Sequence, residues 1–201
     1  MQNESAIGAG ARLRVRRRNG HDLAACVRLL ADVHERDGYP ADWPRLPEAW
    51  LTPPALLKAW VAVSDGRLAG HVALSRGGAG DAAPALWSAR TGAGTDTTAV
   101  VGRLFVSPGA RGRGVGALLL ARAASQAHRH GLHPVLDVAV SDTAACALYE
   151  RLGRRLLGTV RQDWGARQGV VVRCYAAAPP PARPTARPGT GPGATPARRS
   201  S

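Results

Sequence analysis

The sequence predicts an α/β fold in a single domain, with a hairpin-rich N-terminal half followed by a strand–helix–strand–helix–strand unit. Three observations predict it. Residues 60–74 hold two apolar, β-branched runs separated by a turn that contains Asp65-Gly66, which is typical of a β-hairpin. Residues 115–130 place apolar side chains at helical spacing. Residues 134–140 form a short apolar run, which indicates a buried strand.

The other elements of the N-terminal half follow from local patterns. Leu13–Arg16 alternates apolar and basic residues, which predicts a short strand. Asp22 is expected to N-cap an amphipathic helix that begins at the next residue. Residues 39–54 are rich in proline and tryptophan and predict an irregular loop or a broken short helix. Residues 77–97 are rich in glycine and predict a loop, with at most a short strand at residues 85–89.

The C-terminal half adds two more strands and one more helix. Residues 100–106 are apolar and β-branched, which predicts a strand. Ser141 or Asp142 is expected to cap a helix that ends at Gly153. Residues 170–175 supply a final apolar strand.

Composition bounds the class of protein. Of 201 residues, 45% are hydrophobic and 20% are charged, which suits a globular domain with a real core. No apolar run approaches the roughly 18 residues of a membrane span, and the first residues lack the apolar segment of a secretory signal. The three cysteines, Cys26, Cys146 and Cys174, are far apart and form no CxxC pair. We therefore expect a cytoplasmic protein with no metal site.

The folded domain is expected to span residues 11–175, after a flexible N-terminus at residues 1–10. Residues 176–201 contain seven of the fifteen prolines and no apolar side chain larger than alanine. Such a segment buries too little apolar surface to offset its ordering entropy, so it predicts a disordered tail rich in proline and arginine.

The chain is strongly basic, with a formal net charge of +13. Lys58 is its single lysine, so nearly all of the positive charge comes from arginine. Aromatic residues make up 4% and do not interleave with the arginines as a base-stacking surface requires. We therefore do not expect specific nucleic-acid binding, although salt-dependent association through the tail stays open. A basic surface that attracts a polyanionic ligand is the more economical interpretation.

A glycine-rich turn at residues 104–116 is the strongest chemical signal. It joins a strand to a helix and places glycine at 112, 114 and 116. Glycines allow the backbone to approach a ligand, and the helix N-terminus attracts an anion, so the turn suits a pyrophosphate. Arg111 and Arg113 add positive charge. The sequence lacks the Gly-Lys-Ser/Thr of a Walker loop and the Gly-x-Gly-x-x-Gly of a dinucleotide fold, and a purely structural turn is the alternative.

A second motif, at residues 142–153, follows the buried strand. The run Arg-x-x-Gly-x-Gly of residues 111–116, followed by a helix with Ala145, Tyr149 and Gly153, resembles the GNAT-type N-acetyltransferase superfamily. The hairpin at residues 62–74 is similar to the second and third strands of that fold. The resemblance covers residues 12–175 and implies a mixed sheet with helices on both faces.

The resemblance implies that the protein transfers an acetyl group from acetyl-CoA to an amine by direct attack. In the family, the backbone N–H at Val106 stabilises the oxyanion and Tyr149 protonates the leaving thiolate. Tyr149 as a packing residue of its helix is the alternative. The implied acetyl-CoA-binding residues are Leu104, Phe105, Val106, Arg111, Gly112, Arg113, Gly114, Val115, Gly116, Asp142 and Tyr149. Asp142 stands where the family has asparagine, and it can still cap the helix.

The general base is not assigned by resemblance, because the strand at residues 100–106 carries no carboxylate. Asp137, in the next strand, is a candidate catalytic base, and an acid that orders a loop is the alternative. A water chain to solvent, with His71 or a loop acid near its end, stays open. His128, His130 and His133 do not share one face of a helix, so they predict a solvated helix end and no metal.

The acceptor is left open between a small amine, an amino acid, an aminoglycoside-like molecule and a protein N-terminus or lysine. Trp43, Trp50 and Trp60 either line its pocket or pack within the proline-rich loop. A homodimer is the default that the resemblance implies. The alternative function is a non-catalytic acyl-CoA-binding or sensor module.

Overall fold

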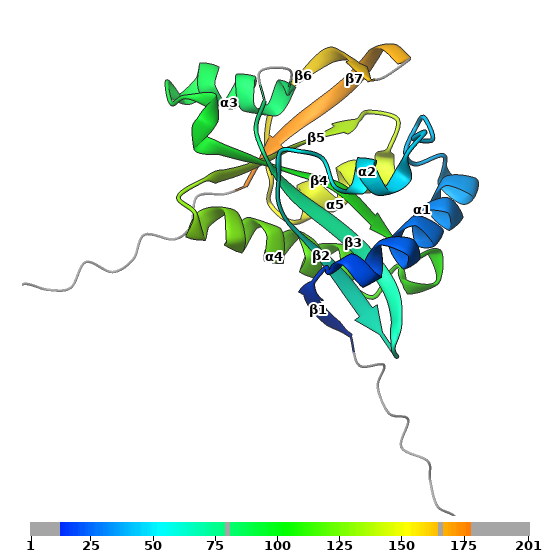
Figure 1. The fold of residues 1–201 in the computed structure, drawn as a ribbon. Coiled ribbons are helices and arrows are strands. Elements are labelled where there is room, and N and C mark those ends of the chain that lie inside the picture. The colour runs from blue at the N-terminus through cyan, green and yellow to red at the C-terminus, as the bar shows by residue number, and fades with distance from the viewer. Residues whose placement is uncertain (1–12, 79–80, 165–166, 178–201) are drawn as a thin grey trace, which may run out of the picture.

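The computed structural model describes residues 13–78, 81–164 and 167–177 (Figure 1). The expected flexible N-terminus at residues 1–10 lies outside these residues, as does the expected tail from residue 178 onward. Within the described part, no helix is both long enough and apolar enough to cross a membrane.

The strands form one seven-stranded sheet in the order β1-β2-β3-β4-β5-β7-β6. Neighbours are antiparallel except β4 and β5, which run parallel, so the sheet is mixed. The strands are β1 (Arg14–Arg17), β2 (Leu56–Ser64), β3 (Arg67–Arg76), β4 (Thr98–Val106), β5 (His133–Ala139), β6 (Arg155–Trp164) and β7 (Arg167–Ala176).

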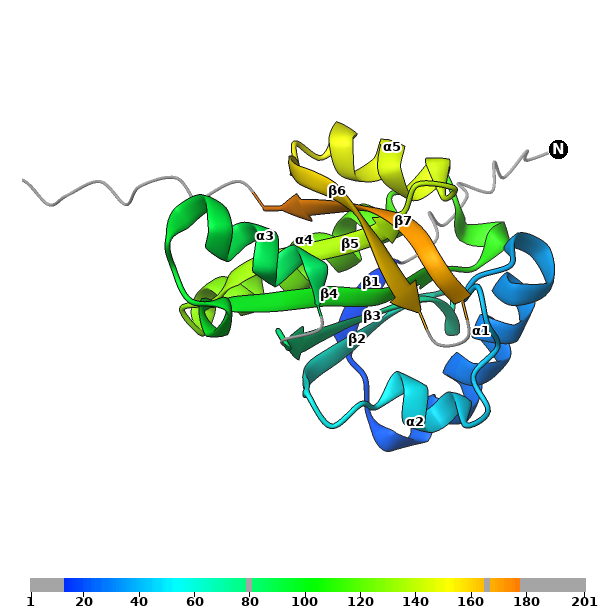
Figure 2. The ribbon, with the colours of Figure 1, turned by 90° about the horizontal axis from the view of Figure 1, so that it is seen from above.

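Helices cover both faces of this sheet. They are α1 (Leu23–Asp37), α2 (Pro47–Leu51), α3 (Ala82–Thr91), α4 (Val115–Arg129) and α5 (Thr143–Arg151). Helices α4 and α5 pack on one face in a cluster that includes Trp60, Leu119 and Tyr175. Helices α1 and α2 pack on the other face over Val61 and Phe105, and α3 extends that layer over β5 and β7. Figure 2 shows α5 and α2 on opposite sides of the strands.

The hairpin and the two long helices are confirmed, because each depends on local signals. The turn between β2 and β3 places Asp65 and Gly66 at φ +50° and +77°, as a tight hairpin requires. Helix α1 begins at Leu23, as predicted. Helix α4 begins at Val115 and buries six apolar residues, spaced as one helical face.

The prediction that residues 77–97 form a loop is wrong, because α3 occupies Ala82–Thr91. Its single proline, Pro84, lies in the first turn, where a missing N–H costs nothing. The helix buries Ala83 against Val135 and Val172 of the sheet. Glycines on both sides of this short alanine-rich stretch are typical of a loop, so the sequence pattern does not indicate the helix.

Strand β6 was absent from the prediction. It is an edge strand, and its alternation is broken by a bulge between Leu156 and Gly158. Leu157 is buried at the bulge and Val160 is half-buried after it, so these two apolar residues of the strand are three positions apart and do not follow one period of two.

Two smaller differences concern the ends of elements. Asp22 does not cap α1 with its side chain. Its carboxylate instead accepts two hydrogen bonds from Arg16, at 2.7 Å each, and one from the Asn19 N–H. At the C-terminal end, Ala176 belongs to β7, and the Ala177 N–H donates to the Pro134 carbonyl, so the packed chain continues to residue 177.

Candidate active site

Strands β4 and β5 pair over three residues and then separate. The parallel register joins Thr98–Val100 to His133–Val135 and goes no further. Beyond it β4 stays paired with β3, and β5 stays paired with β7. We call the remaining segments, residues 101–106 of β4 and 136–139 of β5, the β4–β5 fork. Backbone groups on the facing sides of the fork are free of strand pairing, which makes them available to a ligand.

A bulge in β4 lies at the start of the fork. The β3–β4 register slips between His71 and Ala73, and Arg103 adopts φ +50°, an uncommon conformation for a residue with a side chain. His71 Nδ1 donates to the Arg103 carbonyl at 2.9 Å, and Arg18 Nη1 donates to His71 Nε2 at 3.1 Å. Burial lowers the pKa of His71 to about 4, so the ring stays neutral. Both of its nitrogens are engaged, and His71 therefore holds the bulge.

The end of β4 directs one backbone N–H group into the fork. The Ser107 N–H donates to the Ala69 carbonyl at 2.9 Å, so it points toward β3. N–H groups alternate in direction along a strand, and the Val106 N–H therefore points to the other side, toward the fork.

The glycine-rich turn leads directly from β4 into α4. Gly112 and Gly114 have φ of +74° and +77°, a left-handed conformation that glycine adopts without strain. Gly114 is also the N-cap of α4, and it brings no side chain to satisfy the first N–H groups of the helix. Arg113 is exposed beside them. The turn thus presents backbone donors, a helix dipole and a cation to solvent.

Arg111 is directed differently from the expectation. Its guanidinium forms a two-pronged ion pair with Asp37 at the end of α1, and Nη2 lies 3.4 Å from the Val106 carbonyl. The carboxylate raises the pKa of Arg111, and the guanidinium lowers the pKa of Asp37. Arg111 therefore links the turn to α1, and Asp37 neutralises part of the positive charge that the turn would otherwise offer to an anion.

The other motif side chains divide between the fork and the core. Leu104 and Val106 are half-buried against the α4 face, near the fork. Phe105 points to the opposite face, where it stacks on His71 at 5.1 Å, so only its backbone is free to meet a ligand on the α4 side. Val115 is buried in the core. Gly116 is needed for close packing, because a Cβ there would lie 3.2 Å from Leu148 of α5.

Helix α5 places Tyr149 beside the fork. Asp142 caps the helix as expected, and its Oδ1 accepts from the Ala145 N–H at 2.9 Å. Tyr149 is 6% exposed and packs against Tyr175 at 5.7 Å between ring centres. Its hydroxyl has no hydrogen-bond partner among the described residues. Burial raises the pKa of this phenol, and nearby Tyr39, Asp142 and Asp137 raise it further. The hydroxyl is therefore a proton donor at neutral pH.

Asp137 approaches the fork from the face opposite Tyr149. It lies two residues beyond Val135, the last β5 residue that pairs with β4, and it shares the α3 side of the strand with Val135. Burial raises the pKa of Asp137 to about 6, and the negative charge of Asp81 contributes. A carboxylate with this pKa is mostly ionised at pH 7 and still basic enough to accept a proton.

Three side chains near the fork carried no signal in the sequence. Tyr39, between α1 and α2, packs against both Trp50 and Phe105. The Arg103 guanidinium lies 4.9 Å from the centre of the Trp50 ring, and its Nε donates to the Trp50 carbonyl. Asp81 precedes α3 and acts electrostatically on both Asp137 and Arg103. Tyr39 and Asp81 lie in segments for which the sequence predicts irregular loops. Arg103 lies in the β4 bulge, which changes the direction of its side chain.

The tryptophans have separate roles. Trp50 belongs to the wall around Arg103. Trp60 is 1% exposed in the core on the α4 face, away from that wall. Trp43 is 40% exposed and contacts His34. Of the three, Trp50 alone lies near the fork among the described residues.

The described residues contain no group of three or more histidine, cysteine or acidic side chains arranged to hold a metal ion. His133 stacks on Trp87 with 3.7 Å between ring centres, which gives it a packing role.

Comparison with known proteins places this arrangement among acetyltransferases. Residues 23–153 match the model of the acetyltransferase (GNAT) family. No curated protein sequence matches the chain significantly.

Solved structures share the fold at low sequence identity. The ribosomal-protein-S18-alanine N-acetyltransferase from Escherichia coli is 17% identical with a TM-score of 0.58, over 82% of this chain and 92% of that one. An N-acetyltransferase from Staphylococcus aureus Mu50 is 18% identical with a TM-score of 0.63, over 83% and 98%. A GNAT family acetyltransferase from Brucella melitensis, solved in complex with acetyl-CoA, is 21% identical with a TM-score of 0.56, over 84% and 90%.

Proposed function

The chain belongs to the GNAT acetyltransferase family, and from this premise we propose that it transfers an acetyl group from acetyl-CoA to an amine by direct attack. The observation that carries the proposal is the β4–β5 fork. It lies beside the glycine-rich turn and has a buried phenol on one face and a carboxylate of raised pKa on the other.

Acetyl-CoA is expected to bind along the fork, with its pyrophosphate at the turn of residues 111–116. The left-handed glycines 112 and 114 expose backbone N–H groups there, and the start of α4 adds positive potential. Arg113 supplies an exposed cation. Leu104 and Val106 offer apolar contact to the pantetheine arm, and Asp142 orders the start of α5.

The chemistry divides between three groups. The Asp137 carboxylate accepts a proton from the acceptor's ammonium, which frees the lone pair of the amine. The amine attacks the thioester carbonyl carbon, and the Val106 N–H donates to the oxyanion that forms. The C–S bond then breaks, and the Tyr149 hydroxyl gives its proton to the thiolate of CoA. The nitrogen loses its second proton to solvent, and the tyrosine is reprotonated from solvent.

Two measurements test this proposal. Calorimetric titration with acetyl-CoA is expected to give saturable binding. A thiol-release assay with a panel of amines is expected to give turnover that Tyr149→Phe lowers by about 10- to 1000-fold, while acetyl-CoA binding stays within about two-fold. Phenylalanine keeps the packing of the ring against Tyr175, so a loss of turnover reports on the hydroxyl.

The alternative function, a sensor of acyl-CoA without catalysis, predicts another result. Such a module binds acetyl-CoA but releases no CoA with any amine, and Tyr149→Phe leaves it unaffected. Absence of acetyl-CoA binding to the wild-type protein would contradict both functions.

A further inference from the structure

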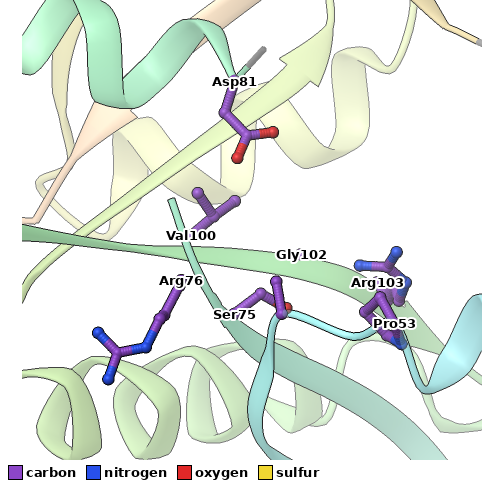
Figure 3. Close-up of a pocket in the computed structure, with 8 residues that line it drawn as sticks. Pro53, Ser75, Arg76, Asp81, Val100, Gly102 and Arg103 are labelled. Atoms are coloured by element: carbon purple, nitrogen blue, oxygen red, sulfur yellow. The ribbon is translucent and has the colours of Figure 1, made fainter. Parts of the chain in front are cut away.

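A small polar cavity of about 150 Å³ lies beside the β4–β5 fork, on the α1–α3 face of the sheet (Figure 3). Ser75 and Arg76 from the end of β3, Asp81 before α3, and Val100, Gly102 and Arg103 of β4 line it, together with the segment before β2. We call it the Ser75–Arg103 cavity. Figure 3 shows Ser75 between Arg76 and Arg103, with Asp81 reaching toward Val100 from the α3 side.

Among the described residues, this cavity holds one buried polar group without a partner, on Ser75, and one cation with unused donors, Arg103. Ser75 is 9% exposed, and its Oγ makes no hydrogen bond to any described residue. A buried hydroxyl without a partner is costly and calls for a ligand or an ordered water. Arg103 is half-buried, and the same part of the chain offers it no carboxylate at ion-pair distance. One Arg103 nitrogen, Nε, donates to the Trp50 carbonyl, and neither Nη group donates a hydrogen bond to a described residue.

The backbone at Arg103 supports a functional role for this side chain. Arg103 has φ +50°, and the buried contact from His71 to its carbonyl fixes that conformation. Strained backbone of this kind persists only where the surroundings hold it, and it is often found at binding sites. The bulge directs the guanidinium to the α1–α3 face, over the Trp50 ring.

The cavity adjoins the reacting end of the fork. Val100 is the last β4 residue that pairs with β5, and Gly102 and Arg103 are the first residues of the fork that line the cavity. Across the fork lies Asp137, which feels the charge of Asp81. Asp81 acts on Arg103 as well, so one carboxylate of the cavity lies within electrostatic range of both groups.

We infer that the Ser75–Arg103 cavity binds the anionic group of the acceptor, so that this protein acetylates an amine that also carries a carboxylate, in the manner of a free amino acid. This inference rests on the proposed function. The carboxylate pairs with the Arg103 Nη groups and accepts from Ser75 Oγ, a geometry that guanidinium favours. The ammonium faces Asp81 and Asp137.

The charges around the cavity favour this class of acceptor over a polyamine. Asp81 Oδ2 already accepts from the Gly78 N–H at 2.7 Å, and with Asp137 it forms one negative side of the site. Arg103 supplies the positive charge of the site. A molecule with charges of both signs satisfies the two sides, whereas a polyamine leaves Arg103 without a partner and adds like charge beside it.

The first experiment compares acceptors that differ only in the carboxylate. Each L-amino acid is assayed beside its carboxamide and its decarboxylated amine, with spermidine included, by release of CoA thiol. Losing one charge-assisted pair corresponds to about 10- to 100-fold in kcat/KM, so the preferred acids are expected to exceed their amides by that factor. Amides and decarboxylated amines turned over as well as the acids would overturn the inference.

Variants of the cavity residues test whether the preference for acids over amides arises at this cavity. Arg103→Gln is expected to raise KM for the acid about 10- to 100-fold, to erase the difference between acid and amide, and to leave acetyl-CoA affinity within two-fold. Ser75→Ala removes an unpartnered hydroxyl, so it is expected to raise KM several-fold while the melting temperature holds or rises. The control, Arg122→Gln, removes an exposed arginine of α4 and is expected to change nothing. An acid preference that survives both Arg103→Gln and Ser75→Ala would place its origin elsewhere.

A binding measurement separates this inference from the proposed function. Saturation-transfer NMR of the same acids and amides, with CoA present, reports binding without turnover. Binding of acids that is lost in Arg103→Gln supports the cavity even if no amine is acetylated, and in that case the proposed function alone fails. Turnover of amines without carboxylate-dependent binding keeps the proposed function and overturns the cavity assignment.

Discussion

At Asp137, the stability of the fold favours a protonated side chain, whereas the proposed chemistry requires the ionised carboxylate. Its pKa of about 6 lies above the usual value of 3.8, so the folded protein holds a proton on it more tightly than the unfolded chain does. Between about pH 4 and pH 6 this group therefore contributes stability at the acid end that is lost as the pH rises. A buried carboxylate that destabilises the fold at neutral pH is what a general base at this position requires.

Asp137→Asn is accordingly expected to stabilise the fold and to lower the rate of turnover. At pH 8 the free energy of unfolding should rise by about 1–3 kcal/mol, and the gain should vanish by about pH 4. Turnover should fall about 100-fold or more, and the rise of kcat/KM through about pH 6 should disappear. Denaturant unfolding at several pH values and a pH–rate profile measure both. A variant with full activity and an unchanged profile would remove Asp137 from the chemistry.

His71 changes the free energy of unfolding with pH in the opposite direction to Asp137. The effect of Asp137→Asn is therefore measured as the difference between variant and wild type at each pH. Burial lowers its pKa to about 4, and the unfolded chain therefore binds the proton more readily between about pH 4 and pH 6.5. Its contribution to stability is present above this range and is lost as the pH falls through it. The neutral ring is needed because its two nitrogens connect Arg18 to the β4 bulge.

At the scale of elements, the turn before α4 depends on backbone conformation. Gly114 has φ +77°, and an added Cβ there would meet no atom within 4 Å, so its cost is purely conformational. Gly114→Ala is expected to cost about 1–2 kcal/mol and to weaken acetyl-CoA binding at least about ten-fold, because the turn shifts its N–H groups.

Gly131 supplies the matched control for that variant. It follows the other end of α4, with φ +69° and equally open surroundings. Gly131→Ala should lower the melting temperature by a similar amount and leave acetyl-CoA affinity unchanged. Titration calorimetry with acetyl-CoA on both variants tests whether the turn itself binds the ligand. Equal losses of acetyl-CoA affinity would show a general effect of backbone strain.

The ion pair between Arg111 and Asp37 couples the same turn to α1. If Arg111 contacts the pyrophosphate, Asp37 competes with acetyl-CoA for it. Exposed pairs are worth up to about 1 kcal/mol, so Asp37→Asn is expected to tighten acetyl-CoA binding by up to about five-fold. Asp32→Asn, which removes an exposed charge one turn away on α1, corrects for the change in net charge. Weaker binding in Asp37→Asn alone would mean that the pair holds the turn in its binding conformation.

At the scale of the whole molecule, the formal charge of +13 favours a polyanion such as acetyl-CoA. Long-range attraction is screened over about 10 Å at 0.1 M salt, so it acts mainly on association. Raising NaCl from 50 to 500 mM is expected to slow association of acetyl-CoA about ten-fold, measured by stopped flow. The analogue that lacks the 3′-phosphate should respond less, and equal or absent salt dependence would exclude steering by net charge.

The sequence alone determined the parts of this protein that depend on neighbouring residues. The β2–β3 turn, the apolar stripes of α1 and α4, the glycine turn and the Asp142 cap each follow from side chains within a few positions of one another. These signals were sufficient for the fold class, because backbone conformation and helical periodicity are local properties. The family was indicated by the resemblance of residues 111–116 and of Ala145, Tyr149 and Gly153 to its motifs.

The tertiary structure decided everything that depends on partners distant in the sequence. Helix α3 and edge strand β6 form because each buries one face against β5 and β7, and neither has a strong pattern of its own. The fork exists because β5 pairs with β7 on its far side while β4 follows β3 through the bulge. The same long-range packing brings Ser75 and Asp81 to one cavity with Arg103, which lies more than 20 residues further along the chain. It also brings Asp81 close enough to Asp137 to act on its charge, and no local sequence pattern predicts either contact.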